Sequence, residues 1–261
     1  MSNAPIIERI ELTAFEIELQ DIVTDRAGFG LSYQPGTRGT HTRFGVRIIS
    51  DTDVVGEYIP PRGRTNVIMT ASEALSYSLI GKPALQREKH YRTMRKLTKH
   101  IGEVGIGAID IALWDLAGKY QGVSVSEMLG GYRERLPAYA STIGGDRLKG
   151  GLSSPEAYAD FAEQCLELGY KGFKMHGWHE GNVAEECAMI KAVCERIGDK
   201  MIIMYDAACH PDTLADAIQI GQVCDEYGLY WLEDPYGDGG GSIHGHQMLK
   251  KSVKTPILIS E

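Results

Sequence analysis

Three acidic residues recur at a nearly constant interval in the C-terminal half of this 261-residue chain, each at the end of an apolar run. Asp206, Glu233 and Glu261 lie 27 and then 28 residues apart. That interval fits one strand, one helix and two short loops, which is the crossover that parallel strands require. The pattern therefore predicts a parallel β/α array with polar groups at the carboxyl ends of its strands, where α/β barrels and open sheets place their active sites.

The three carboxylates predict a cation site. At roughly 4 Å apart, each pair would repel by about 4 kcal/mol at an effective dielectric of 20, so the group must take up protons or bind a cation. All-oxygen ligation favours Mg²⁺ over Mn²⁺ or Ca²⁺. One acidic residue at a strand end is more often a helix N-cap or a solvated charge, but three at one interval favour a metal site. Asp234 is the weaker candidate, as a cap or an outer contact of the ligands.

Lys174 and His176 end another apolar run, and they point the same way because strand side chains repeat every two residues. Two basic groups on the inner face of a parallel strand are costly unless they are used. One interpretation is a lysine paired with a barrel carboxylate beside a satisfied histidine. The other is a base held over a metal-bound substrate, where the neighbouring cation keeps the second basic group deprotonated.

Composition narrows the class of protein. With 43% apolar and 24% charged residues the chain is typical of a globular protein, and a net charge of −8 argues against a nucleic-acid or membrane-surface partner. The five cysteines lack C-x-x-C spacing, and all but Cys209 lie in expected helices, so we expect free thiols in a reducing cytoplasm. The chain opens without a signal-peptide pattern and contains no apolar run near 18 residues, which indicates a soluble cytoplasmic protein.

The first 135 residues predict an α+β domain. Residues 7–19 roughly alternate apolar and polar side chains, and residues 44–49 and 54–59 add two apolar runs joined by Ser-Asp-Thr-Asp, which together indicate an antiparallel meander. Residues 21–43 are rich in Gly, Thr and Arg without periodicity, which predicts a long loop, either a disordered insert or a lid. Helical spacing follows at residues 70–80, 84–99, 106–120 and 126–129.

After residue 135, strands and helices alternate. The expected strands are residues 136–141, 172–176, 201–206, 229–233 and 257–261. The expected helices begin at Ser154, Asn182 and Asp212, and glycines 169, 198 and 228 end them. A closed barrel has eight strands and an open five-stranded sheet would expose an apolar edge, so we expect roughly three further β/α units in the working protein. A native mass near 28.7 kDa would instead indicate an incomplete barrel.

The ordered motifs resemble the enolase superfamily, and within it the mandelate racemase and muconate-lactonizing group. Residues 105–119 (GIGAIDIALWDLAGK) are similar to the helix that ends the capping domain of this group. Lys174-Met-His176, Asp206-Ala-Ala, Leu232-Glu-Asp-Pro and the terminal Ile-Ser-Glu261 are similar, in order, to its base motif and its three metal ligands.

This resemblance implies an α/β protein with an N-terminal α+β capping domain at residues 1–135. Residues 136–261 would form the first part of a TIM-like (β/α) barrel, about five strands of it. The resemblance also implies Mg²⁺ held by Asp206, Glu233 and Glu261, and catalysis by Lys174 and His176.

The chain departs from the pattern of the group in three ways. Lys-x-His replaces the usual Lys-x-Lys, which puts His176 at the position of the proton-abstracting base, although a Lys174 base with His176 as electrophile is an alternative. Asp206-Ala-Ala208 stands where Asp-x-Asn is common, which removes a polar side chain. The later barrel strands, which often supply a His–Asp dyad, are absent from this sequence, so the second acid or base is unassigned.

The resemblance implies a reaction that begins with removal of the proton α to a carboxylate. We favour dehydration of a sugar acid, an aldonate or aldarate, to a 2-keto-3-deoxy acid, because a lid rich in hydroxyl and guanidinium groups suits a polyhydroxylated anion. The alternatives are a racemase, epimerase or cycloisomerase of a carboxylic acid and, in another class, a non-catalytic homologue with an incomplete barrel.

The remaining expectations concern contacts with substrate and partners. Histidines 179, 210, 244 and 246 are expected in loops at the mouth of the barrel. The expected partners are a small-molecule carboxylate and further copies of the chain, with neither nucleic acid nor membrane. The candidate substrate contacts are Tyr33, Arg38, His41, Tyr58, Arg62 and His210.

Overall fold

The computed structural model describes residues 4–24, 31–61, 63–237 and 241–260, which form two compact units. Unit 1 comprises Met1–Glu18 and Thr40–Arg135, and unit 2 comprises Leu19–Gly39 and Leu136–Glu261. The distal part of the first hairpin therefore groups with the C-terminal unit. The predicted division into domains at residue 135 stays a prediction. Each unit is described by itself.

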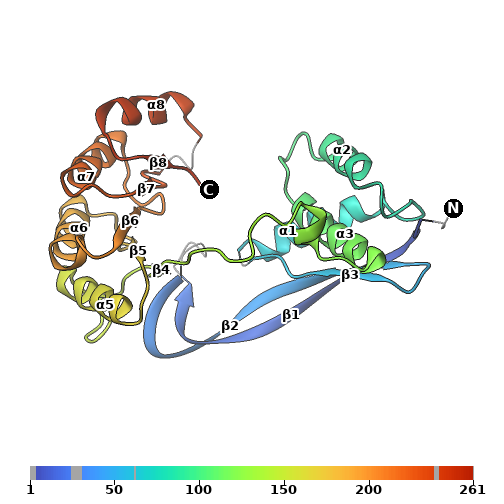
Figure 1. Cartoon of the computed structure of the whole chain (residues 1–261), viewed down its shortest axis with the longest axis horizontal. Helices are drawn as coiled ribbons and strands as arrows, with labels where there is room; N and C mark the ends of the chain where they lie inside the picture. Colours follow the sequence, from blue (N-terminus) through green and yellow to red (C-terminus); the bar gives the residue numbers. More distant parts are fainter. Residues whose placement is uncertain (1–3, 25–30, 62, 238–240, 261) are drawn as a thin grey trace. The chain divides into compact units, whose positions relative to one another are not determined.

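Unit 1 packs helices on one face of a three-stranded sheet with the order β1-β2-β3 (Figure 1). Its strands are β3 (Val55–Tyr58) and the parts of β1 (Ile7–Thr24) and β2 (Leu31–Ser50) that lie before Leu19 and after Gly39, and β2 pairs with β3 in antiparallel register. Its helices are α1 (Thr65–Ser76), α2 (Arg87–Leu97), α3 (Ile106–Gln121) and α4 (Val125–Met128). A glycine at position 56 allows close packing of α3 on β3, because a Cβ there would lie 2.1 Å from the carbonyl oxygen of Ala112.

The long loop predicted at residues 21–43 is wrong for the part of it that the structure describes. β1 continues to Thr24, and β2 begins at Leu31, so the segment is mostly strand. Many side chains along residues 33–40 are exposed, so the segment shows no alternation of apolar and polar residues. Backbone pairing between neighbouring strands, which leaves no side-chain pattern, is what forms these strands.

Unit 2 contains the expected parallel sheet, with the strand order β4-β5-β6-β7-β8. The strands are β4 (Ala140–Ser141), β5 (Gly172–His176), β6 (Ile202–Asp206), β7 (Leu232–Glu233) and β8 (Ile257–Leu258), and every neighbouring pair is parallel. The prediction of about five parallel β/α strands is confirmed. The strands are shorter than the apolar runs predicted, most of all β4, β7 and β8.

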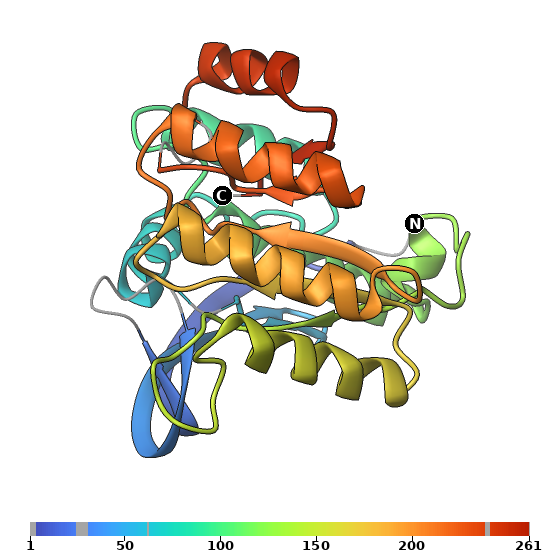
Figure 2. The same ribbon diagram turned by 90° about the vertical axis from the view of Figure 1, so that its left-hand side faces the viewer.

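A layer of helices covers one face of this sheet. Figure 2 shows α5 (Pro155–Glu167), α6 (Val183–Ile197) and α7 (Leu214–Tyr227) side by side in chain order. Side-chain oxygens of Ser154, Asn182 and Thr213 cap their first turns, as the sequence indicated for the first two. Among the described residues, no helix is both long and apolar enough to cross a membrane.

A fourth helix in this unit, α8 (Ile243–Ser252), was missed by the sequence analysis. It contains His244 and His246, so their assignment to a loop is wrong. Glycine and histidine are weak helix formers, and two of each lie between residues 241 and 246. The hydroxyl of Ser242 compensates by accepting a hydrogen bond from the backbone N–H of Gly245, 3.0 Å away.

The two faces of β5 and β6 differ in chemistry. Phe173, Met175, Ile203 and Tyr205 are buried in the apolar core beneath the helices. Lys174, His176 and Asp206 alternate with them along the strands and therefore lie on the opposite face. The helices thus fix the sheet from one side, and the other side is left for polar groups.

Candidate active site

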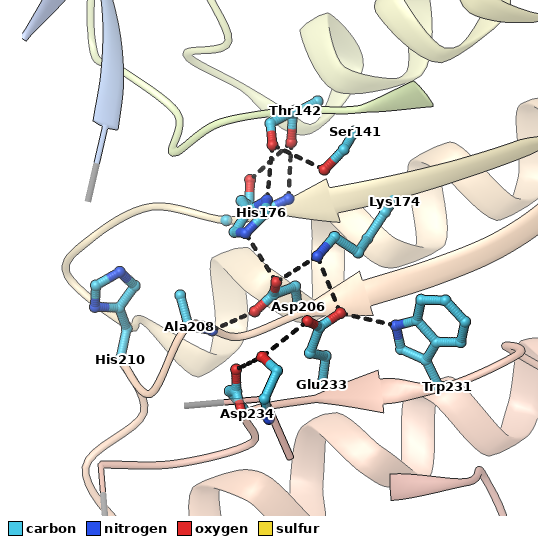
Figure 3. Close-up of polar contacts among 12 residues, drawn as sticks. Ser141, Thr142, Lys174, His176, Asp206, Ala208, His210, Trp231, Glu233 and Asp234 are labelled. Carbon is cyan, nitrogen blue, oxygen red and sulfur yellow. Dashed lines mark hydrogen bonds and ion pairs between the residues drawn. The ribbon is translucent and has the colours of Figure 1, made fainter. Parts of the chain in front are cut away.

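The register of three neighbouring strands brings the predicted charged residues to one level. His176 pairs with Asp206 across β5 and β6, and Asp206 pairs with Glu233 across β6 and β7. Because side chains at paired positions of parallel strands point to the same face, all three converge at the carboxyl ends of the strands (Figure 3). Lys174 lies one pleat below, on the same face.

Lys174 lies between two of the predicted metal ligands. Its Nζ donates to Oδ2 of Asp206 at 2.7 Å and to Oε2 of Glu233 at 3.0 Å. The lysine side chain is 9% exposed, and both carboxylate side chains are equally well buried. The ammonium group is therefore held in place by two charged hydrogen bonds, which are stronger than neutral ones.

His176 is held at both ring nitrogens. Its Nε2 lies 2.8 Å from Oδ2 of Asp206, the atom that also accepts from Lys174. Its Nδ1 lies 2.7 Å from the carbonyl oxygen of Thr142, which follows β4 (Figure 3). The two basic residues that the sequence singled out thus meet on one carboxylate oxygen.

Three buried acids could hold a metal ion. Oxygen atoms of Asp206, Glu233 and Asp234 all lie within 4.8 Å of one another. Asp234 accepts from the backbone N–H and the hydroxyl of Ser260, and the same hydroxyl oxygen lies 3.1 Å from Oε1 of Glu233. Three carboxylates against one lysine leave an excess of buried negative charge, and an all-oxygen set fits Mg²⁺. The predicted third ligand, Glu261, lies outside the described residues.

The charges shift two pKa values in directions that suit this arrangement. Burial alone would lower the pKa of Lys174, but the hydrogen bonds and charges of Asp206 and Glu233 outweigh it and raise that pKa. Burial would raise the pKa of Asp206, but His176 and then Lys174 outweigh it and lower the pKa to about 2. A raised pKa is the reverse of what a lysine base needs, so the site favours Lys174 as a fixed cation.

The turn after β5 is packed against a buried carboxylate. Glu186 of α6 is 1% exposed and accepts from the backbone N–H of Trp178 at 2.9 Å and from the hydroxyl of Tyr205 at 3.0 Å. A Cβ on Gly177 would lie 1.7 Å from Oε2 of Glu186. The acid therefore ties the chain just after His176 to the strand that carries Asp206.

The predicted substrate contacts are placed in different parts of the molecule. Tyr33 lines a cavity of about 720 Å³ together with Ser141 and Thr142 in unit 2, and Arg38 of the same unit is exposed. His41 and Tyr58 belong to unit 1, where Tyr58 packs against the apolar core. Arg62 lies outside the described residues. These contacts stay predictions.

His210 lies after β6, and its Nε2 is 3.0 Å from Nδ1 of His179, which follows β5. The two rings meet edge to face, with their centroids 4.9 Å apart. Both histidines are in loops at the carboxyl ends of the strands, where the sequence analysis expected them. The predicted contact of His210 with substrate stays a prediction.

Sequence analysis overlooked several residues that hold the site. Thr142 contacts His176, Trp231 Nε1 donates to Oε2 of Glu233 at 3.0 Å, and Ser260 bridges Glu233 and Asp234. Thr142 and Ser260 follow the ends of β4 and β8, whereas Trp231 directly precedes β7. For Thr142 and Ser260, the position after the carboxyl end of a parallel strand is the signal that would have identified them.

Two family models match the chain. The description "Mandelate racemase / muconate lactonizing enzyme, N-terminal domain" matches residues 34–130, and "Enolase C-terminal domain-like" matches residues 157–261. Both matches agree with the resemblance drawn from the motifs.

Individual relatives have low sequence identity to this chain. The D-galactarolactone cycloisomerase of Agrobacterium fabrum is 34% identical over 199 residues, and the match covers 73% of this chain and 50% of that protein. The L-talarate/galactarate dehydratase of Salmonella typhimurium is 26% identical, with 98% of this chain and 63% of that protein covered. The chain therefore spans about half to two thirds of the length of these relatives.

Among solved structures, D-glucarate dehydratase from Agrobacterium tumefaciens complexed with magnesium superposes with a TM-score of 0.84 at 27% identity. The match covers 98% of this chain and 67% of that one. The fold of the whole chain, capping part and parallel sheet included, is therefore that of these enzymes.

Proposed function

The chain belongs to the mandelate racemase and muconate-lactonizing group of the enolase superfamily. We propose that it acts as a metal-dependent enzyme that dehydrates a sugar acid. The reaction would begin by removing the proton α to the carboxylate and would yield a 2-keto-3-deoxy acid. One observation carries the proposal: Lys174 and His176 both contact a single oxygen of Asp206, with Glu233 beside it.

The acids would hold Mg²⁺ at the carboxyl ends of β6 and β7. Asp206 and Glu233 are the proposed ligands, with Glu261 as the third from the sequence pattern and Asp234 beside them. When bound, the cation would stabilise the negative charge that develops on the substrate carboxylate as the α-proton leaves. Lys174 would add a second, fixed positive charge on the same side.

His176 is the proposed acceptor of the α-proton, a role that Nε2 can fill only when it is not donating its own hydrogen to Oδ2 of Asp206. An imidazole nitrogen with a free lone pair can take a proton, whereas an ammonium group cannot. The two carboxylates that hydrogen-bond Lys174 favour its ammonium form, which leaves the histidine as the base. This assignment follows the departure from Lys-x-Lys noted in the sequence.

Loss of water would complete the reaction. The electron pair of the broken C–H bond forms a double bond between the α and β carbons while the β-hydroxyl leaves. An acid supplies one proton to that hydroxyl, which departs as water, and the enol rearranges to the 2-keto-3-deoxy acid. Relatives named L-talarate/galactarate dehydratase and D-xylonate dehydratase support this outcome.

A cycloisomerase is the second candidate. The relative named D-galactarolactone cycloisomerase, at 34% identity, favours it, as does one named 3,6-anhydro-alpha-L-galactonate cycloisomerase at 28%. Such a reaction also needs a base next to a carboxylate, but it releases no water. The same residues of this chain would serve both reactions, so product analysis must separate them.

The test is a panel of aldonates, aldarates and their lactones incubated with the protein and Mg²⁺ in deuterated water. We expect a 2-keto acid from at least one compound and, with His176→Asn, loss of both product and deuterium exchange at the α-carbon. Exchange with an isomer as product would favour the cycloisomerase. Neither product nor exchange with any acid would contradict the proposal and favour a non-catalytic homologue.

A further inference from the structure

We propose that Glu186 is a positioning residue for His176: from the helix side of the sheet, its carboxylate holds the turn that follows His176 against β6, the strand of Asp206. The inference rests on the proposed function only for the role of His176 in the reaction. The position of His176, which Glu186 determines, can be measured without substrate.

The two oxygens of Glu186 contact two different segments of the chain. Oε1 accepts from the backbone N–H of Trp178 at 2.9 Å, two residues after His176. Oε2 accepts from the hydroxyl of Tyr205 at 3.0 Å, and Tyr205 precedes Asp206 in β6. Glu186 is 1% exposed, so water competes little for these bonds. One side chain of α6 thus connects the end of β5 to the end of β6.

The carboxylate supplies a hydrogen-bond acceptor that the turn does not obtain from the sheet. β5 ends at His176, so the N–H of Trp178 lies beyond the paired part of the strand. Other elements hold the remaining polar groups of the turn. The carbonyl of Gly177 accepts from the N–H of Gly145 at 3.0 Å, and the carbonyl of His176 accepts from the hydroxyl of Tyr158. Because buried backbone groups need partners, loss of the carboxylate would force the turn to move or leave this N–H unsatisfied.

The turn also packs directly against the carboxylate. A Cβ on Gly177 would lie 1.7 Å from Oε2 of Glu186, so only glycine lets the backbone approach the acid this closely. On the next residue, the indole of Trp178 donates to the carbonyl of Leu152 at 2.9 Å and packs edge to face on Tyr158. The acid and the indole thus hold the turn together, and removal of the acid would leave its end next to β5 without support.

A glutamine can replace the acid in both contacts, whereas an alanine can replace it in neither. The amide oxygen of Glu186→Gln would accept from the N–H of Trp178, and the amide NH₂ would donate to the hydroxyl oxygen of Tyr205, which can also accept. Comparison of the Gln and Ala variants therefore separates the two hydrogen bonds from the charge of the carboxylate.

The direct test is the crystal structure of the Mg²⁺-loaded full chain as wild type, Glu186→Gln and Glu186→Ala. The separation of His176 Nε2 from Asp206 Oδ2, 2.8 Å in the structure described here, should be equal in the wild type and the Gln variant. It should be longer by about 1 Å in the Ala variant, a displacement large enough to impair catalysis. An unmoved His176 in the Ala variant would overturn the proposal whatever the substrate proves to be. If the Ala variant does not fold, Glu186→Met, which fills the space without an acceptor, carries the same expectation.

Turnover gives the second readout. We expect kcat of Glu186→Ala to fall about 100-fold, the cost of a misplaced catalytic group, while KM stays near the wild-type value. Glu186→Gln should restore most of kcat. Equal losses of kcat in the Gln and Ala variants, or a loss confined to KM, would contradict the inference.

Asp225→Ala is the matched control. Asp225 of α7 accepts from the backbone N–H groups of Lys254 and Thr255 at 2.8 and 2.6 Å, so its replacement also removes a carboxylate that ties a helix to the chain beside a strand. Those two residues precede β8, at the end of the strands opposite His176. The control should lower stability without moving His176 or changing kcat. If no acid is turned over even by the wild-type protein, the proposed function fails, while the position of His176 in the variants still decides the role of Glu186.

Discussion

Two lysines in this molecule have the same partners by type and nearly the same geometry. Lys174 in unit 2 bridges Asp206 and Glu233 at 2.7 and 3.0 Å, and Lys119 in unit 1 bridges Asp115 and Glu57 at 2.8 and 3.1 Å. Carboxylates raise the pKa of both lysines against the opposing effect of burial. The lysine side chains differ in exposure, 9% against 44%.

The difference shows that distance alone does not identify a functional ion pair. At the surface, water and salt weaken the attraction, and the carboxylate Glu57 also pairs with Arg47. In the buried site each group was removed from water at a cost that only its partners offset. Burial at the carboxyl ends of parallel strands therefore marks Lys174, whereas Lys119 braces α3 against β3.

Replacing each lysine by methionine tests this contrast, and the larger effect is expected at the buried site. Lys174→Met leaves two buried carboxylates without their cation, which should lower the free energy of unfolding by about 3–5 kcal/mol. Urea unfolding with a chelator present measures the loss, and Mg²⁺ should recover part of it by replacing the positive charge. A loss no larger than that of Lys119→Met would refute the contrast.

Glu186 is a buried acid that, unlike Asp206, accepts hydrogen bonds from two uncharged donors, the N–H of Trp178 and the hydroxyl of Tyr205. Burial outweighs those hydrogen bonds and raises its pKa from 4.5 to about 7. The folded protein therefore favours the protonated form of Glu186. This preference contributes fully to the free energy of unfolding below pH 4.5, and the contribution is lost as the pH rises through about 7. At ~1.4 kcal/mol per pKa unit the loss is about 3 kcal/mol.

Comparison with Glu186→Gln isolates this effect, because the amide does not titrate. Urea unfolding of both proteins at pH 4.5 and pH 8 should show that the wild-type protein loses stability relative to the variant. A constant difference between the two proteins across this range would mean that Glu186 titrates normally.

Metal binding should stabilise the protein through the buried acids Asp206, Glu233 and Asp234, and not through Asp115 and Glu57, the exposed cluster around Lys119. Mg²⁺ at 100 times its dissociation constant should raise the free energy of unfolding by about 2.7 kcal/mol. Asp206→Asn should remove most of that gain, because it replaces an anionic ligand by a neutral one. Asp115→Asn in the exposed cluster is the matched control and should leave the gain intact. Thermal unfolding with Mg²⁺ and with EDTA measures both, and equal responses would argue against a metal site at Asp206.

The smallest effect is expected for Lys119→Met. Exposed ion pairs contribute about 0–1 kcal/mol, and salt screens them, so the change in unfolding free energy should be under about 1 kcal/mol. The difference should shrink further at high ionic strength. A loss of several kcal/mol that persists in salt would mean that the surface cluster is as critical as the buried one.

The sequence predicted the parallel sheet well because buried strands leave a strong signal. Residues 172–176 form β5 as expected, and Asp206 and Glu233 end β6 and β7. Each is an apolar run that stops at a charged residue, a pattern that depends only on local sequence. The hairpin of β1 and β2 lacks such a pattern, since its distal strands are held by pairing with each other.

The site was predicted in part for the same reason. Lys174, His176, Asp206 and Glu233 could be grouped because the strands that carry them are regular. The contact between Thr142 and His176 could not, because it depends on the register of strands 34 residues apart. The conformation at Asp234 could not be predicted either, because its backbone has a φ of 40°, a left-handed conformation that an alternating strand pattern does not anticipate.

The fit between Gly177 and the carboxylate of Glu186 places a joint constraint on two positions of the chain. Any side chain at 177 would collide with the acid, so position 177 is restricted to glycine as long as Glu186 is kept. A related sequence could have a larger residue at position 177 only if Glu186 were first replaced by a smaller residue. That replacement would also remove the contacts by which Glu186 connects the turn after His176 to β6, the strand of Asp206. Glu186 on helix α6 therefore limits which residues can evolve next to His176, and so limits changes in specificity there.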